Sequence, residues 1–152
     1  MKLRPYQQQA LDQSLEGFKK FQRQLVVIPT GGGKTILFAA MAKVIQPERT
    51  LILAHREELV DQAIEKLHKA TGIVAQKEKA EHRASLQAPV VVASIQTMVR
   101  RLDNWPRDHF KLVVCDEAHH CFPYETPILT ERGLVPIGEI VERKLSIKVA
   151  AF

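Results

Sequence analysis

The chain has 152 residues, of which 45% are hydrophobic and 26% are charged, and these proportions describe a globular chain rather than a disordered one. Its apolar runs are far shorter than a membrane span and its first residues lack an apolar signal core, so we expect a cytoplasmic protein with no membrane partner. The net charge of +5 lies within residues 1–120, because residues 121–152 carry four basic and four acidic side chains. A basic segment of this kind suits phosphate or nucleic-acid partners.

Apolar runs alternate with helical patterns along residues 1–120. Helical spacing predicts helices that begin at Pro5, cover Lys34 to about Ile45 and Arg56 to Ala70, and pass through Met98 and Leu102. Buried strands are predicted at Leu25–Ile28, Leu51–Ala54, Val90–Ala93 and Leu112–Cys115. Residues 77–88 are charged and fit either an exposed helix or a loop. The alternation predicts an α/β fold with a parallel sheet, whose ligands bind at the carboxyl ends of the strands.

A glycine-rich loop follows the first predicted strand and opens the next helix. Its backbone amides can surround phosphate oxygens, and the helix N-terminus adds partial positive charge. Lys34 is expected to reach the outer phosphates, and the Thr35 hydroxyl can bind Mg²⁺. Ile28 stands where the general pattern has its first glycine, and an incidental turn is the alternative. The candidate phosphate loop comprises Gly31, Gly32, Gly33, Lys34 and Thr35.

Two adjacent carboxylates, Asp116 and Glu117, follow the last predicted strand. We expect them at the same edge of the sheet as the phosphate loop, since carboxyl ends of parallel strands share an edge. In nucleoside triphosphate chemistry the first such carboxylate holds Mg²⁺, and the second orients the attacking water. A solvated strand end is the alternative.

Pro29-Thr30-Gly31-Gly32-Gly33-Lys34-Thr35 and Asp116-Glu117-Ala118-His119 together resemble motifs of superfamily-two helicases and translocases of the DEAH type. The resemblance implies an incomplete RecA-like P-loop domain over residues 1–120 that uses ATP and Mg²⁺, with DNA as partner and RNA left open. The similarity points to bacterial DNA helicases and the translocating subunits of restriction enzymes. The later motifs of that family and its second RecA-like domain are missing, so we expect this chain to bind ATP weakly and hydrolyse it negligibly.

Further motifs extend the resemblance in family order. Leu3–Gln7 is similar to the adenine-reading motif, which makes Gln7 the expected base contact. Ala54–Leu59 and Ser94–Met98 are similar to motifs that contact the nucleic-acid backbone. The residue roles that this implies are nucleotide binding by Gln7 and Thr30, and nucleic-acid binding by His55, Arg56, Gln96 and Thr97.

From Cys121 the pattern becomes short and strand-like, with prolines. Strands are predicted at Ile128–Thr130, Leu134–Val135 and Leu145–Phe152, with a bend at Pro136–Gly138. Residues 121–152 resemble the opening block of an intein, a self-excising domain. The residues that carry this resemblance are Cys121, Thr126, Thr130, Gly133 and the run Pro136–Val141. It implies an incomplete, short all-β segment after the helicase part.

The intein resemblance implies a reaction at the junction. Cys121 would attack the carbonyl of His120 and turn that peptide bond into a thioester. A complementary C-terminal intein–helicase fragment is then the expected partner, and splicing in trans would join His120 to the remainder of the helicase. Helicase activity would stay off until that excision. The alternative is that the chain is a truncated product of an interrupted gene.

Other interpretations stay open. Cys121 could be a structural cysteine in a helicase insertion. A metal site at Cys115, His119, His120 and Cys121 is another, although the spacing matches no common zinc pattern. The whole chain could be a non-catalytic nucleic-acid-binding fragment, or a stand-alone P-loop ATPase.

Overall fold

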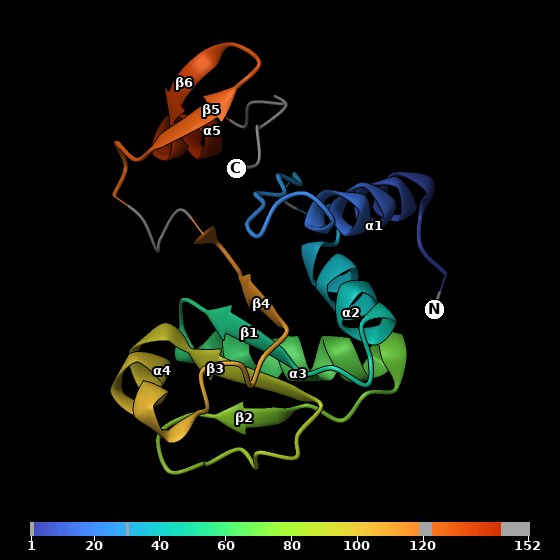
Figure 1. Ribbon diagram of the computed structural model, residues 1–152, viewed down its shortest axis with the longest axis vertical. Coiled ribbons are helices and arrows are strands. Elements are labelled where there is room, and N and C mark those ends of the chain that lie inside the picture. The colour runs from blue at the N-terminus through green and yellow to red at the C-terminus, as the bar shows by residue number, and fades with distance from the viewer. Residues whose placement is uncertain (1, 30, 119–122, 144–152) are drawn as a thin grey trace. The chain divides into compact units, whose positions relative to one another are not determined.

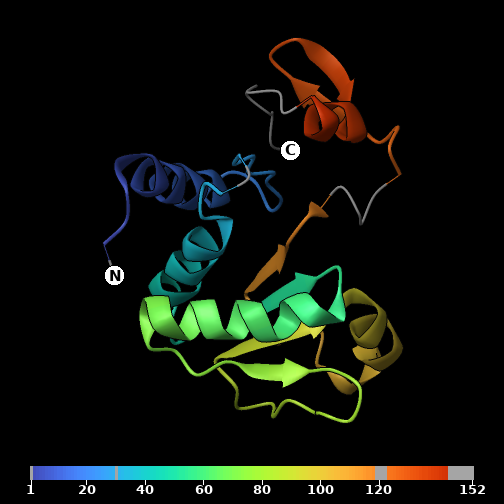
Figure 2. The ribbon, with the colours of Figure 1, turned by 180° about the vertical axis from the view of Figure 1, so that it is seen from behind.

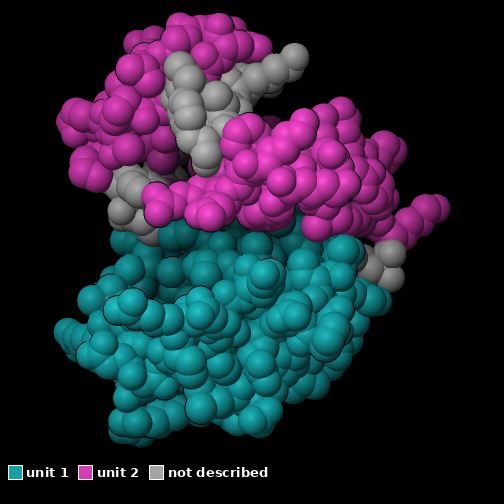
Figure 3. Space-filling model, in the orientation of Figure 1, with its two compact units in different colours: residues 1, 35–117 teal, residues 2–34, 118–152 magenta. Residues whose placement is uncertain are grey.

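A computed structural model describes residues 2–29, 31–118 and 123–143. The chain divides into two compact units (Figure 3), of which unit 1 comprises residues 1 and 35–117 and unit 2 comprises residues 2–34 and 118–152. No helix in the described ranges is long and apolar enough to cross a membrane.

Unit 1 is built on a parallel sheet (Figure 1). Its strands, among the described residues, are β1 (Thr50–Ala54), β2 (Gln76–Glu78), β3 (Val90–Ser94) and β4 (Leu112–Cys115), in the order β2-β3-β1-β4. All neighbouring pairs are parallel. The predicted parallel α/β architecture is therefore confirmed for this unit.

Helices cover both faces of the sheet. The helices are α2 (Lys34–Val44), α3 (Glu57–Thr71), α4 (Ile95–Arg101) and the short 3-10 helix η1 (Leu102–Asn104). α2 and α3 pack on one face, where Ala39, Val60 and Leu67 are buried against β1 and β3 (Figure 2). Met98 of α4 and Trp105 pack against the opposite face. α3 ends at Gly72, whose left-handed φ of 76° matches the predicted helix stop.

In unit 2, α1 (Pro5–Phe18) begins at Pro5 as predicted. The strand predicted at Leu25–Ile28 is wrong, because the structure assigns these residues no regular element. Val26 is 37% exposed and Val27 is 43% exposed, whereas a strand covered on both faces would bury them. A strand needs a hydrogen-bonded neighbour, and no described residue pairs with this segment. An apolar run alone is therefore not sufficient to form a strand.

The described part of the expected intein segment folds as a hairpin followed by a helix. β5 (Pro127–Thr130) pairs antiparallel with β6 (Gly133–Pro136), which confirms two predicted strands. The predicted bend after β6 is instead the start of α5 (Ile137–Glu142), so the all-β description is wrong here. Ile137 and Ile140 are buried and lie three positions apart, a helical spacing that the proline and glycine concealed. The strand predicted at Leu145–Phe152 lies outside the described residues.

Candidate nucleotide and nucleic-acid sites

The phosphate loop has a backbone that requires glycine. Gly31 and Gly33 both have φ of 79°, a left-handed conformation that side chains with a Cβ disfavour. The Gly32 N–H donates to the Pro29 carbonyl at 2.9 Å, which closes the turn. A Cβ on Gly32 would lie 2.5 Å from Ile28 Cγ2 and 2.9 Å from the Pro29 oxygen. α2 begins directly afterwards at Lys34, so the loop leads into a helix N-terminus as an anion site requires.

The first turn of α1 is hydrogen-bonded to this loop. Gln7 is 5% exposed, and its Nε2 donates to the Gly32 carbonyl at 3.1 Å. Its Oε1 accepts from the Arg4 N–H at 3.0 Å, so these two bonds use one N–H and one lone pair of the amide. The Tyr6 hydroxyl donates to the same Gly32 carbonyl at 2.8 Å. Sequence reasoning identified Gln7 but assigned no role to Tyr6, because a tyrosine after proline carries no signal for a contact 26 residues away.

The carboxylate pair lies at the carboxyl end of β4. The Asp116 N–H donates to the Leu53 carbonyl at 2.9 Å and extends the pairing with β1 by one residue. Asp116 Oδ1 accepts from the Glu117 N–H at 3.0 Å. Glu117 has a left-handed φ of 52°, which costs a non-glycine residue about 1–3 kcal/mol. Strain of this size in a residue predicted to be catalytic is consistent with a functional turn.

The predicted nucleic-acid contacts follow two neighbouring strands. Ala54 of β1 is in register with Ser94 of β3, so His55 and Gln96 leave the same edge of the sheet. Gln96 Nε2 donates to the His55 carbonyl at 3.5 Å, which brings the two predicted motifs together. Leu53 is in register with Cys115, so the carboxylate pair also leaves this edge. Unit 1 therefore gathers these predicted groups at one edge.

Two of the predicted contacts differ in their surroundings. Arg56 is exposed just before α3. Thr97 is only 9% exposed, its N–H donates to Ser94 Oγ at 3.2 Å, and its hydroxyl accepts from the same Oγ at 2.9 Å. Ser94 is thus the N-cap of α4, and Thr97 completes the cap.

Several predicted site residues lie outside the described residues. These are Thr30 of the phosphate loop and the junction residues His120 and Cys121. Three of the four residues in the alternative metal site lie there too. Among the described residues, no group of three or more histidine, cysteine or acidic side chains is arranged to hold a metal ion.

The hairpin segment downstream contains two local features. Thr130 is 7% exposed, and its hydroxyl donates to the Gly133 carbonyl at 2.8 Å and accepts from the Arg132 N–H at 3.0 Å. A Cβ on Gly138 would overlap the Tyr124 ring, so this contact requires glycine. The Tyr124 hydroxyl donates to Glu142 at 3.0 Å, and this hydrogen bond raises the pKa of the tyrosine.

The sequence model of the family described as "Type III restriction enzyme, res subunit" matches residues 1–130. That match ends ten residues past the expected junction at residue 120. The chain is 32% identical over 130 residues to "Putative ATP-dependent helicase IRC3" of Saccharomyces cerevisiae, covering 78% of this chain and 19% of that protein. It is 36% identical over 128 residues to "Putative mitochondrial ATP-dependent helicase irc3" of Schizosaccharomyces pombe, covering 79% and 21%. The chain thus spans about a fifth of the length of these relatives.

A solved structure shares the fold. A nuclease-deletion mutant of the type ISP restriction-modification enzyme LlaGI, in complex with a DNA substrate mimic, superposes with a TM-score of 0.61. The alignment covers 78% of this chain and 15% of that one, at 20% identity. At this identity the similarity supports the fold alone.

Proposed function

Because the chain belongs to the type III restriction enzyme res subunit family and carries a helicase-type ATP-binding domain, we propose that residues 1–120 serve a helicase or translocase acting on DNA. The observation that carries the proposal is the phosphate loop: a turn whose backbone favours glycine, directly before α2 and hydrogen-bonded to Tyr6 and Gln7.

The residue types that the sequence motifs supply match the chemistry that a nucleotide with its metal ion needs. Amides of the glycine turn and the Lys34 ammonium bind the phosphates, and the remaining hydrogen-bonding capacity of Gln7 reads the base. Thr35 and Asp116 offer one hydroxyl and one carboxylate, the small set of oxygen ligands that Mg²⁺ uses beside phosphates and water. The ion neutralises charge on the phosphates when it is bound. Glu117 orients the attacking water and accepts its proton.

DNA binding is assigned to the loops that follow β1 and β3. Arg56 offers a planar cation that suits phosphate, and Gln96 offers an exposed amide beside His55. The cap between Ser94 and Thr97 fixes the backbone that presents Gln96. We call His55, Arg56 and Gln96 the nucleic-acid track.

For residues 121–152 we propose the N-terminal segment of an intein that splices in trans. Cys121 Sγ attacks the His120 carbonyl, the C–N bond breaks as the C–S bond forms, and the thiol proton ends on the released amine of Cys121. The hairpin of β5 and β6, turning at Gly133 with Thr130 fixed against it, supports this assignment. The RecA-like domain in which Asp116 and Glu117 act would then be completed only after splicing to the complementary fragment.

Nucleotide binding is tested by titrating the 152-residue chain with a fluorescent ATP analogue in the presence and absence of Mg²⁺. We expect weak binding that Lys34→Ala abolishes and Lys43→Ala, an exposed lysine on the same helix, leaves unchanged. Equal binding by both variants would contradict the proposed site. Steady-state phosphate release by the chain alone would identify it as a stand-alone ATPase.

Splicing is tested by mixing the chain with the complementary C-terminal fragment and following mass. A ligated product that lacks residues 121–152, absent for Cys121→Ala, is the expected result. No ligation together with no thiol-induced cleavage after His120 would refute it.

A further inference from the structure

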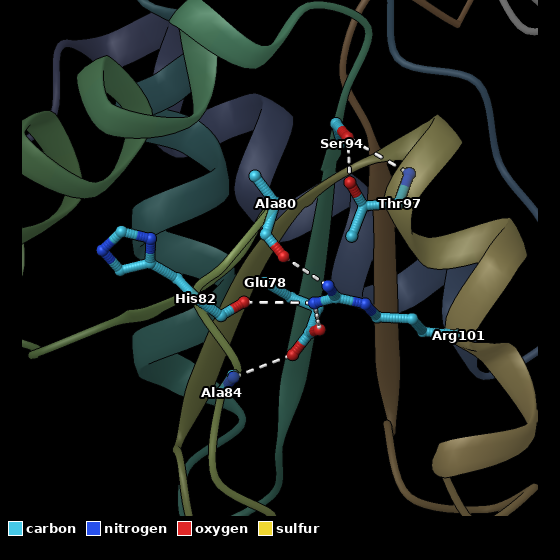
Figure 4. A network of polar contacts seen from close by, with 7 residues as sticks. All are labelled: Glu78, Ala80, His82, Ala84, Ser94, Thr97 and Arg101. Atoms are coloured by element: carbon cyan, nitrogen blue, oxygen red, sulfur yellow. Dashed lines mark hydrogen bonds and ion pairs between the residues drawn. The ribbon is translucent and has the colours of Figure 1, made fainter.

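A buried carboxylate organises the turn that follows β2. Glu78 is 2% exposed, and one of its oxygens accepts a hydrogen bond from the Ala84 N–H at 2.8 Å. Its other oxygen pairs with the guanidinium of Arg101, the last residue of α4. Arg101 also donates to the carbonyls of Ala80 and His82, the latter at 3.2 Å (Figure 4). A single guanidinium therefore holds the turn against the sheet.

Residues 79–83, which we call turn 79–83, are closed by two backbone hydrogen bonds. The Lys79 N–H donates to the His82 carbonyl at 3.1 Å, and the His82 N–H donates to the Lys79 carbonyl at 2.7 Å. Two of its carbonyls accept hydrogen bonds from Arg101. The side chains of Glu81, His82 and Arg83 are exposed. In Figure 4 the His82 ring points away from Arg101. The carbonyls of Ala80 and His82 thus face inward, while Glu81, His82 and Arg83 are exposed to solvent.

The register of the sheet locates turn 79–83 at the edge that carries the nucleic-acid track. Glu78 pairs with Ala93, so the turn begins level with Ser94, just before Gln96. On the other side of β3, Ala54 pairs with Ser94, and His55 follows. The three strand ends therefore lie in a row, and neighbouring strands are about 4.8 Å apart. The row spans about 10 Å, which matches a few nucleotides of a bound strand.

We propose that turn 79–83 contacts phosphate and extends the nucleic-acid track past Gln96. Arg83 is the contact, since its guanidinium offers the planar donors that suit phosphate oxygens. Arg101 and Glu78 are positioning residues that act through the turn backbone. The ligand is the sugar–phosphate backbone of a nucleic-acid strand, and the inference rests on the proposed binding of nucleic acid by this domain. Glu81, in the same turn, carries the opposite charge and repels the same phosphates.

Three single-charge variants test the proposal, because Arg83 and Glu81 carry opposite charges and therefore predict effects of opposite sign. Affinity for a single-stranded oligonucleotide is measured by fluorescence anisotropy at several salt concentrations. Arg83→Ala should weaken binding and lower the slope of log affinity against log salt by about 0.7, so the affinity lost between about 50 and 200 mM salt shrinks about 2.5-fold. Glu81→Gln should strengthen binding. Lys111→Ala, an exposed charge just before β4 at the opposite end of the strand, should change neither quantity.

Arg101→Lys tests the positioning role. The lysine keeps the positive charge beside Glu78 but lacks the planar guanidinium that donates to two carbonyls of the turn. In this background the effects of Arg83→Ala and Glu81→Gln should both shrink, whereas a merely structural role for Arg101 would leave them additive. Circular dichroism confirms that each variant is folded.

The controls separate this inference from the proposed function. If Arg56→Ala weakens binding while Arg83→Ala and Glu81→Gln match Lys111→Ala, the turn is not a contact and the inference is overturned. If the unchanged chain does not bind nucleic acid, the proposed nucleic-acid function is overturned as well.

Discussion

Replacing Gly32 by alanine should impair phosphate binding more than it destabilises the fold. The added methyl would lie 2.5 Å from Ile28 Cγ2 and 2.9 Å from the Pro29 carbonyl oxygen, both closer than van der Waals contact allows. The Pro29 oxygen belongs to the backbone and accepts the hydrogen bond that closes the loop, so relief requires the turn itself to open. Overpacking of this kind costs about 1–3 kcal/mol. If this whole free-energy cost falls on the nucleotide-bound state, nucleotide affinity falls about 5- to 150-fold.

Two other glycines provide matched controls for this substitution. Gly31 and Gly72 have φ of 79° and 76°, and a Cβ on either meets no atom within 4 Å. Alanine at each position therefore introduces the same left-handed strain, about 1–2 kcal/mol, without a clash. At Gly72, the end of α3, the strain should lower the melting temperature by about 2–4 °C per kcal/mol and leave nucleotide affinity unchanged. At Gly31 the strain lies in the loop and should lower affinity too.

The assay combines thermal unfolding with titration of a fluorescent ATP analogue for all three variants. The expected order of affinity is Gly72→Ala equal to the unchanged chain, then Gly31→Ala, then Gly32→Ala. Unchanged affinity for Gly32→Ala in a folded protein would refute the reasoning that this turn holds phosphate.

Three further outcomes are expected. Ser94→Ala removes the N-cap of α4 and should lower the free energy of unfolding by about 1 kcal/mol, as measured by urea denaturation; no change would contradict the capping role. Burial lowers the pKa of His109, which stacks edge-on against Phe110 with ring centroids 4.7 Å apart. The unfolded chain then binds more protons, so stability should fall as pH drops below about 6.5, and His109→Phe should reduce the difference in melting temperature between pH 7 and pH 5. Gly138→Ala should push the Tyr124 ring away and destabilise residues 123–143, detected as faster amide exchange there, whereas Gly133→Ala, with φ of 94° and open space, should strain only the hairpin turn.

The sequence predicted those elements whose pattern is created by burial. Helix α3 and strands β1 and β3 repeat their apolar residues with the period of the element, and the structure has them within a residue or two of the expected bounds. Strand β2 escaped detection because Gln76, Lys77 and Glu78 are all polar, and its pairing with β3 is settled by tertiary structure. The opposite error occurred at Leu25–Ile28, where a strand was predicted but does not form. An apolar run forms a strand only when a neighbouring strand pairs with it.

The same distinction between predictable and unpredictable features holds for the candidate site. Loops that follow strands could be located from sequence, since chain order and parallel pairing fix the edge they share, as for His55 and Gln96. Side-chain contacts between distant residues could not. Glu78 and Arg101 are 23 positions apart, and neither residue type is unusual on a surface. Only the fold reveals that this carboxylate is buried and needs a cation.

The shared acceptor at Gly32 makes the start of α1 and the phosphate loop a thermodynamically linked pair. Tyr6 and Gln7 both donate to that one oxygen, so a ligand that reorients the Gly32 peptide must break or carry along both bonds. Such coupling is reciprocal: if phosphate binding changes the affinity of the helix end for a ligand, that ligand changes the affinity for phosphate by the same factor. If Gln7 reads the base and the loop binds the phosphates, as proposed, the two binding events are coupled through the Gly32 carbonyl.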